Sequence, residues 1–444
     1  MKTKLGGKFY LTLIIFSLFG QIAWVVENML LSDFIKSEFD ADNFQVALMV
    51  SLSAVVATIT TLLIGALSDK LGKRKIFICS GYIIWGLSIL CFTFSTRDAL
   101  TNLMGDGVNV AVLGISLVIV FDCLMTFFGS AANDACFNSW VTDSTDNTNR
   151  GGVEGINSMM PLIATLIVFG LLSGYAKPGS WHIVFIVLSI LTIAAGILGF
   201  FTIKDAPIEK KEDSHYFKDI VYGFRPSVVK ENVSLYAVLL LFAIFGIGLQ
   251  AFMPYLVTYY KVTITGTIIG FDTYVFIMAP AIILAAVFTF FYGRLYDKIG
   301  FFKSILGSLA ILIVGLTILF IFKEQDKDIA MKFIGSLLMM SGYLGSNAIF
   351  GAKIRDLTPS GKVGLFQGIR IIGQVLVPML IGPWLGAAAS SGDFTYDENV
   401  FTGAYSTPPN SNIFLAGLIV IILTLGASIL VNHLLLKEKK NEEK

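Results

Sequence analysis

Two carboxylates lie inside long apolar runs, where a charged group is costly and therefore usually functional. Asp122 sits in the apolar run 116–128, and Glu27 sits in the run 9–31. A carboxylate held in such surroundings can bind a cation and release it again when its environment changes. We therefore expect Asp122 and Glu27 to exchange a coupling cation. A purely structural ion pair or hydrogen bond is the alternative for Asp122.

Polar side chains recur at helical spacing around Glu27 and form one stripe. The stripe follows the i, i+3, i+4, i+7 pattern of a single helix face. A lipid-facing carboxylate would cost at least about 2.5 kcal/mol, so this face should point to a cavity. Sugars offer hydroxyls to amides and carboxylates, and a flat C–H face to an aromatic ring. The stripe predicts substrate contacts from Gln21, Trp24, Glu27 and Asn28. A tryptophan that only packs and a Glu27 near the outer surface are the alternatives.

A second polar face surrounds Arg370, the one basic residue placed deep within an expected helix. Gln367 and Gln374 flank it at i−3 and i+4. A buried arginine without a partner is improbable. Its candidate partners are carboxylates of the first half of the chain, namely Asp122, Asp134 and Glu27. Contact with an anionic substrate is the other possibility.

Two further candidates come from positions in the second half that correspond to polar positions of the first. Gln250 corresponds to Trp24, and Asn347 corresponds to Asp134. With Arg370 and Gln374 they complete the expected substrate-binding set, and packing is the alternative for each.

The elements that position these residues are membrane-spanning helices. Of the 444 residues, 55% are hydrophobic and only 14% are charged, a balance that a soluble domain does not show. The apolar runs are about 20 residues long, enough to cross a bilayer as helix. We expect an all-α integral membrane protein with twelve transmembrane helices, at residues 10–32, 44–67, 76–96, 108–132, 152–175, 182–203, 233–258, 267–292, 303–322, 331–352, 363–388 and 412–436.

Lysine and arginine predict the orientation of these helices. If the N-terminus is cytoplasmic, 24 of the 32 basic residues fall on the cytoplasmic side. Seven fall on the other side: Lys36, Arg97, Lys177, Lys261, Lys323, Lys327 and Lys332. We therefore expect a multi-pass protein of the plasma membrane with both termini cytoplasmic. The first run is too long for the core of a signal peptide and carries a carboxylate, which favours a first helix.

Several other classes of function lack support in the sequence. The net charge of +1 gives no reason to expect nucleic acid as a partner. The four cysteines lack paired spacing, so neither a disulfide nor a metal site is expected. No nucleotide-binding loop or catalytic triad is visible, which argues against an enzyme and against a cofactor. We expect a monomer in the bilayer.

The chain repeats itself in two halves. Gly65, Leu67, Asp69, Lys70 and Gly72 recur 228 residues later as Gly293, Leu295, Asp297, Lys298 and Gly300. Two further sets recur in register, which favours duplication. We expect a six-helix bundle at 1–203, a polar cytoplasmic linker at 204–232 that is either a short surface helix or a disordered tether, and a second bundle at 233–444. Such parallel repeats around a midplane cavity are typical of secondary transporters.

The loop 65–75 carries a family resemblance. Its sequence Gly-Ala-Leu-Ser-Asp-Lys-Leu-Gly-Lys-Arg-Lys resembles the signature between helices 2 and 3 of the major facilitator superfamily, and 292–303 is a weaker second copy. The resemblance implies the fold of that superfamily, alternating access, and a loop that latches the two halves together on the cytoplasmic side. The gating residues that it implies are Asp69, Lys70, Arg74, Asp297, Lys298, Glu154 and Gln367.

Two details of this loop are expected from the same resemblance and from its charges. Asp69 should face the start of helix 11 near Gln367, and Asp297 should face the start of helix 5 near Glu154. The basic cluster 73–75 should hold the loop at anionic lipid headgroups. Charges that only set the topology are the alternative.

Within the superfamily, the stretches 20–28, 133–134 and 140–143 are similar to glycoside–pentoside–hexuronide:cation symporters and sucrose-type symporters. That similarity implies cation-coupled import of a sugar or glycoside. The second expected helix carries only hydroxyls and lacks the paired aspartates of melibiose-type carriers, so a proton is favoured over sodium. A proton-coupled exporter of drugs or other amphipathic solutes is the main alternative, and a non-transporting receptor or assembly factor is the other.

Overall fold

The computed structural model describes residues 5–105, 109–145, 150–205, 222–265, 267–268, 271–323, 327–359, 363–391 and 407–442. The chain divides into two compact units. The first consists of Met1–Gln45, Leu52–Tyr216 and Gly403–Thr407. The second consists of Val46–Ser51, Phe217–Thr402 and Pro408–Lys444.

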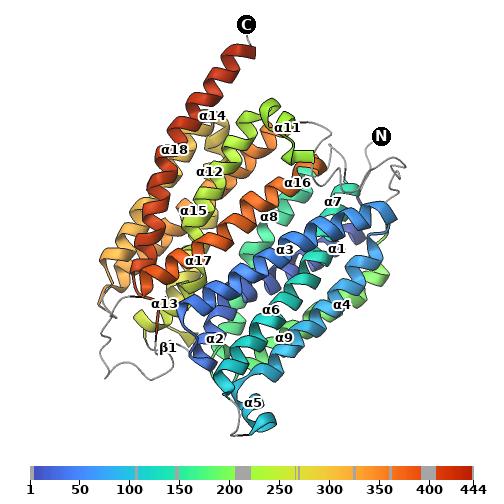
Figure 1. The fold of residues 1–444 in the computed structure, drawn as a ribbon, viewed down its shortest axis with the longest axis vertical. Helices are drawn as coiled ribbons and strands as arrows, with labels where there is room; N and C mark the ends of the chain where they lie inside the picture. The colour runs from blue at the N-terminus through green and yellow to red at the C-terminus, as the bar shows by residue number, and fades with distance from the viewer. Residues whose placement is uncertain are drawn as a thin grey trace. The chain divides into compact units, whose positions relative to one another are not determined.

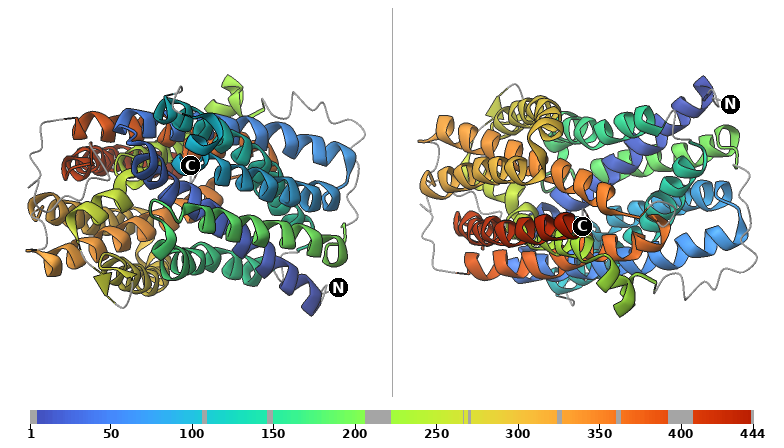
Figure 2. Two further views of the ribbon diagram at one scale, coloured as in Figure 1. Left: turned by 90° about the horizontal axis from the view of Figure 1, so that it is seen from below. Right: turned by 90° about the horizontal axis from the view of Figure 1, so that it is seen from above.

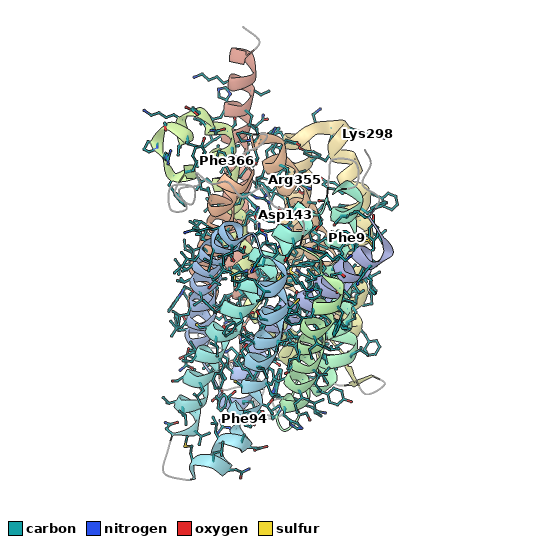
Figure 3. All side chains as sticks on the ribbon, turned by 90° about the vertical axis from the view of Figure 1, so that its right-hand side faces the viewer. Phe9, Phe94, Asp143, Lys298, Arg355 and Phe366 are labelled. Carbon is teal, nitrogen blue, oxygen red and sulfur yellow. The ribbon has the colours of Figure 1, made fainter. Side chains whose placement is uncertain are left out.

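The first unit is a set of long helices (Figure 1). In chain order its helical segments, with η marking π and 3₁₀ turns, are α1 (Gly7–Val25), η1 (Val26–Leu30), α2 (Leu31–Phe39), α3 (Asn43–Leu71), α4 (Lys75–Cys91), η2 (Phe92–Ser95), α5 (Arg97–Met104), α6 (Val110–Gly129), η3 (Ser130–Phe137), α7 (Asn138–Asp143), α8 (Arg150–Ile167), η4 (Val168–Leu172), η5 (Ser173–Tyr175) and α9 (Trp181–Thr202). Phe9 and Asp143 lie toward one end of this unit and Phe94 lies at the other (Figure 3).

The second unit is also helical, and Figure 2 shows its helices from below and from above. Its segments are η6 (Tyr222–Phe224), α11 (Pro226–Glu231), α12 (Val233–Gln250), η7 (Met253–Tyr255), α13 (Leu256–Thr263), β1 (Thr267–Ile268), β2 (Phe271–Asp272), α14 (Val275–Ile321), α15 (Ile329–Leu357), α16 (Val363–Ile371), η8 (Ile372–Leu376), α17 (Val377–Ser390) and α18 (Asn412–Glu442). The long α14 is two helices joined at Gly300, whose φ of 78° breaks the helical geometry.

The expectation of an all-helical, multi-span protein is confirmed. Eleven helices in the described part of the chain are long and apolar enough to cross a membrane. The shorter apolar segment Met159–Tyr175 completes the helix that begins at Arg150. Of the expected linker, most lies outside the described residues, and its last part contains η6 and α11.

Several expected boundaries are wrong by more than four residues. The eighth span was placed from residue 267, but residues 267–272 contain an antiparallel pair in which Thr267 is opposite Asp272, and the helix begins at Val275. The first span runs on to Phe39, and the fourth runs on to Asp143. Apolar content fixes the middle of such helices, whereas tertiary contacts fix where they end.

Two of the lysines assigned to the non-cytoplasmic side, Lys36 and Lys332, are buried. Lys36 is 1% exposed, and its Nζ donates a hydrogen bond to the carbonyl of Ala41 at 3.1 Å. In the second unit, Lys332 donates to the carbonyl of Thr263 at 2.9 Å. Both carbonyls lie at or just beyond a helix C-terminus, where a cation is favourable.

Glycines allow close packing at particular positions rather than along whole stretches. The glycine-rich stretch 342–351 has a composition that permits close helix packing. A Cβ added at Gly342 would lie 2.4 Å from the backbone nitrogen of Leu312, so α15 packs against α14 backbone to backbone there. At Gly351 nothing lies within 4 Å. The expectation is therefore correct for one end of the stretch only.

Gly342→Ala should destabilise the protein because the new methyl meets backbone rather than a side chain that can move. Overpacking of this kind costs about 1–3 kcal/mol. The matched control is Gly351→Ala on the same helix, which should leave stability unchanged or slightly raised. Thermal unfolding of the purified protein in detergent measures both. Equal midpoints for the two variants would contradict close packing at Gly342.

Candidate functional site

A cluster of polar groups connects the first membrane-spanning helix (helix 1, formed by α1, η1 and α2) to the fourth (helix 4, formed by α6, η3 and α7) within the first unit. Glu27, at the start of the π turn η1, is 7% exposed. Its Oε1 accepts a hydrogen bond from Oγ1 of Thr126 on α6 at 3.0 Å. Among the described residues its Oε2 has no hydrogen-bond partner. One carboxylate oxygen is therefore held by a hydroxyl while the other is buried and unsatisfied.

Asp122 lies one helical turn before Thr126 and is 1% exposed. The hydroxyl of Ser53 on α3 donates a hydrogen bond to this carboxylate. Within the described part of the chain Asp122 Oδ1 has no hydrogen-bond partner. Asp122 and Glu27 are close enough to interact electrostatically. The two expected cation-exchanging residues therefore lie together, supported by one hydroxyl each.

A third carboxylate, Asp134, completes the polar face between these helices. It accepts a hydrogen bond from the indole of Trp24 and one from Oγ of Ser130 at 3.2 Å. Trp24 is half-buried and stands against Trp85, with ring centroids 5.1 Å apart. The sequence predicted Asp134 only as one possible partner of Arg370. Its place beside Trp24 is new information from the structure.

The π segment η3 determines which residues of α6 and its continuation face the first helix. Asn133 is eleven residues after Asp122, which puts both on one face of a regular α-helix. In η3 the backbone hydrogen bonds follow the i→i+5 pattern of a π-helix. The residues that follow are therefore rotated about the helix axis, relative to their positions in a regular α-helix. Asn133 instead lies against Gly20, where an added Cβ would be 2.5 Å from its amide nitrogen. Asp134 takes the position near Glu27 and Trp24.

The rest of the helix 1 stripe serves more than one purpose. Ser17 donates to Oδ1 of Asn157 on α8 at 2.5 Å, which fastens helix 1 to helix 5. Gln21 is half-buried. Asn28 is exposed and donates to the carbonyl of Trp24 at 2.8 Å, within its own helix. Trp24 and Glu27 are the members of the stripe that meet helix 4.

The candidate substrate contacts of the second unit differ in their exposure to solvent. Gln250 is half-buried at the end of α12, where the helix gives way to the turn η7. Asn347 on α15 is exposed. Arg370 and Gln374 are half-buried on α16 and η8, and the side chain of Gln367 lies outside the described residues. Their roles as substrate contacts, and the pairing of Arg370 with a carboxylate, stay predictions.

The loop that follows α3 is held by a buried arginine. Arg74 is 4% exposed, and its Nε contacts Oδ2 of Asp143 at 3.1 Å. Its guanidinium also donates to the hydroxyl of Ser68. Asp205 accepts from the backbone nitrogens of Arg74 and Lys75 at 2.9 and 2.7 Å. These contacts join the end of α3, the end of α7 and the residues after α9 to the start of α4.

The expectation that Arg74 binds lipid headgroups is therefore wrong. Its charge is turned inward to Asp143, whereas Lys70 and Lys73 are exposed. The side chains of Asp69 and Glu154 lie outside the described residues. Gating by any of these residues is untested.

The second copy of this loop is held to its neighbouring helix by a different side chain. Gly72 and Gly300, which correspond in the repeat, both have positive φ, at 62° and 78°. In place of the arginine bridge, Oη of Tyr296 donates directly to Oδ2 of Asp356 at 2.9 Å. Lys298 is exposed and lies at the same end of the second unit as Arg355 and Phe366 (Figure 3). The side chain of Asp297 lies outside the described residues.

No group of three or more histidine, cysteine, aspartate or glutamate side chains in the described residues is arranged to hold a metal ion. What the first unit does contain is a pair of buried carboxylates with hydroxyl support, and a tryptophan fixed to a third carboxylate.

Comparisons with known proteins agree on the family. The model of the Major Facilitator Superfamily matches residues 12–383. An uncharacterized MFS-type transporter of Methanocaldococcus jannaschii is 25% identical over 352 residues, which cover 77% of this chain and 81% of that protein.

Solved structures of the same fold include a D-xylose–proton symporter, with a TM-score of 0.70 and 13% identity over 94% of this chain and 97% of that one. A bacterial homolog of the human lysosomal transporter Spinster gives a TM-score of 0.68 and 13% identity over 97% and 98% of the two chains. The nucleoside transporter NupG gives 0.65 and 13% over 95% and 98%. At these identities the likeness shows the fold alone.

Arg74→Gln should destabilise the first unit because it leaves Asp143 without its cation and removes the donors to Ser68. Breaking a fully buried pair costs about 3–5 kcal/mol, and the partial exposure of Asp143 makes the expected loss smaller. The matched control is Lys73→Gln, an exposed neighbour, which should leave the unfolding midpoint unchanged. A midpoint for Arg74→Gln equal to that of the control would show that the network contributes nothing.

Proposed function

Because this chain belongs to the major facilitator superfamily, a family of multi-pass membrane transporters, we propose that it is a secondary active transporter that imports a sugar or glycoside together with a monovalent cation. The observation that carries the proposal is the paired carboxylates Glu27 and Asp122 beside the Trp24–Asp134 pair, all within the first unit. The first pair suits a coupling cation, and the second suits a polyhydroxylated solute. Their proximity links the two binding events.

The Trp24–Asp134 pair supports a sugar as the substrate. The indole of Trp24 lies beside the carboxylate of Asp134 and packs against Trp85, and these contacts orient the ring before a ligand arrives. The ring remains half-exposed, and such a surface stacks against the apolar C–H face of a sugar. The carboxylate of Asp134 can accept from a sugar hydroxyl, and Gln21, one turn before Trp24, can offer its amide.

The remaining substrate contacts that we propose come from the second half of the chain. They are Gln250, Asn347, Arg370 and Gln374. Arg370 would either pair with a carboxylate or contact an acidic group of a hexuronide. In the same scheme the loops around Lys70 and Lys298 gate the cytoplasmic side, and both termini are cytoplasmic.

Uptake into proteoliposomes tests the proposal directly. With an inward gradient of protons or of sodium, the purified protein should accumulate at least one labelled sugar or glycoside above its external concentration. Collapse of the gradient should abolish that accumulation, and liposomes without protein serve as the control. If no sugar moves and preloaded lipophilic cations leave the vesicles instead, the protein is an exporter and the proposal is wrong.

Asp122→Asn should separate coupling from substrate movement. The neutral amide cannot hold the cation, so uphill accumulation should be lost while exchange of substrate down its gradient continues. The matched control is Ser116→Ala on the same helix, because Ser116 is exposed and its hydroxyl donates to the Val112 carbonyl of its own helix. Undiminished accumulation by Asp122→Asn would remove this residue from coupling.

A further inference from the structure

The short helix α5 is amphipathic, and part of its apolar face is uncovered. At α-helical spacing its eight residues divide into two opposite arcs, one apolar (Ala99, Leu100, Leu103 and Met104) and one polar (Arg97, Asp98, Thr101 and Asn102). Leu100 is 2% exposed and packs inside its own unit, whereas Leu103 and Met104 are 68% and 52% exposed. The described protein therefore covers one side of the apolar arc and leaves the other side open.

Hydrogen bonds hold the start of α5 against α2. Oε2 of Glu38 accepts from the backbone nitrogen of Arg97 at 2.8 Å, and Nε of Arg97 donates to the carbonyl of Glu38 at 2.5 Å. Oγ1 of Thr96 accepts from the backbone nitrogen of Ala99 at 3.4 Å and caps the helix. Glu38 is 4% exposed. Contacts with buried groups thus set the direction in which the uncovered face points.

The position of α5 is at the edge of a membrane-spanning helix. That helix ends at Ser95, and α5 begins two residues later at Arg97, so an extended chain separates them by at most about 7 Å. Phe94 on η2 is 60% exposed and lies at the end of the unit away from Phe9 and Asp143 (Figure 3). Figure 1 shows α5 at that same end. The open apolar face therefore starts where the hydrocarbon region stops.

We propose that α5 lies in the headgroup region of the bilayer at this end of the first unit, with Leu103 and Met104 inserted among the lipid chains. The bilayer then covers the apolar surface that the protein leaves open, and Phe94 meets the same leaflet. In the orientation proposed above, this is the outer leaflet. Amphipathic helices of this kind place their apolar face about 5–10 Å into the boundary between headgroups and acyl chains.

The charges of α5 indicate that apolar contact, and not headgroup charge, holds it in the bilayer. The helix contains one arginine and one aspartate. The guanidinium of Arg97 is engaged with Glu38 and lies 5.9 Å from the centroid of the Phe39 ring. Helices that select anionic lipids carry clusters of lysine and arginine instead. We therefore expect α5 to occupy uncharged and anionic bilayers alike.

The size of the open face favours lipid over a protein partner. Eight residues form a helix about 12 Å long. A stable protein–protein interface takes about 20–30 residues from each side, which is more than α5 and its neighbouring turn offer. Lipid chains need no such minimum area, because the spanning helices already hold the protein in the bilayer.

Nitroxide labels on the full-length protein in phosphatidylcholine nanodiscs test this position. Leu103→Cys and Met104→Cys place a label on the apolar arc, and Thr101→Cys and Asn102→Cys are matched controls on the polar arc, since all four side chains are exposed. Saturation of the spin signal compares collisions with oxygen, which concentrates in lipid, and with a water-soluble nickel chelate. Labels at positions 103 and 104 should show a several-fold higher ratio of oxygen to nickel collisions than labels at 101 and 102.

The native cysteines have to be kept out of this measurement. Cys91 and Cys123 are half-buried and are replaced by alanine, whereas Cys79 and Cys136 are buried and stay in place. The same background without an added cysteine measures any remaining labelling. Because Leu103 and Met104 are exposed, their substitution should leave the folded protein intact.

The outcomes distinguish lipid from water and from protein as the cover of α5. Equal nickel collision rates at all four positions would place the helix in water and overturn the inference. Labels at 103 and 104 that neither reagent reaches would indicate a protein partner or a second copy of the chain, which also contradicts it. Added phosphatidylglycerol, or salt at about 1 M, where charges are screened within about 3 Å, should leave the ratios unchanged. A ratio that falls with salt would show that charge holds the helix instead.

Discussion

A carboxylate buried inside an apolar helix bundle needs a partner for each of its oxygens, and this requirement organises the first unit. Glu27, Asp122 and Asp134 all lie between helices, and hydroxyl or indole donors hold one side of each. The donors of Asp134 are Trp24 and Ser130, whereas one oxygen each of Glu27 and Asp122 is left over. These two oxygens are the reason for proposing Glu27 and Asp122 as the residues that exchange the coupling cation.

The irregular turns of the helices are what bring these groups together. Glu27 lies in the π turn η1 and Asp134 lies in the π turn η3, on the two helices that face each other. The second unit has a related irregularity, because α12 ends at Gln250 and the 3₁₀ turn η7 follows. π turns are common at functional sites because they re-aim side chains without breaking the helix. In this chain they place carboxylates where a regular helix would not.

The duplicated loops show how far the two halves have diverged while keeping one geometry. Gly72 and Gly300 both have a positive φ, which a glycine adopts without strain. Asp143 and Asp356 correspond in the repeat, yet one is held by Arg74 and the other by Tyr296. The backbone constraint is thus conserved between halves, whereas the side chains that fasten the neighbouring helix differ. In the first loop Arg74 and Asp143 are both charged, whereas in the second loop the donor to Asp356 is the neutral hydroxyl of Tyr296. Only the first of these contacts therefore depends on a positively charged side chain.

The sequence by itself determined the helical, multi-span class, the duplication and the two acids at the site, because each depends on local composition and spacing. Long apolar runs specify helices, and a carboxylate inside such a run is improbable without a function. Only the tertiary structure decided that Asp134 rather than Asn133 joins Glu27, that Ser53 and Thr126 support the acids, and that Arg74 faces inward. Those outcomes depend on π turns and on contacts between distant helices, and neither leaves a periodic signal in the chain. The ends of helices 1, 4 and 8 were misplaced for the same reason, since buried contacts rather than apolar content fix them.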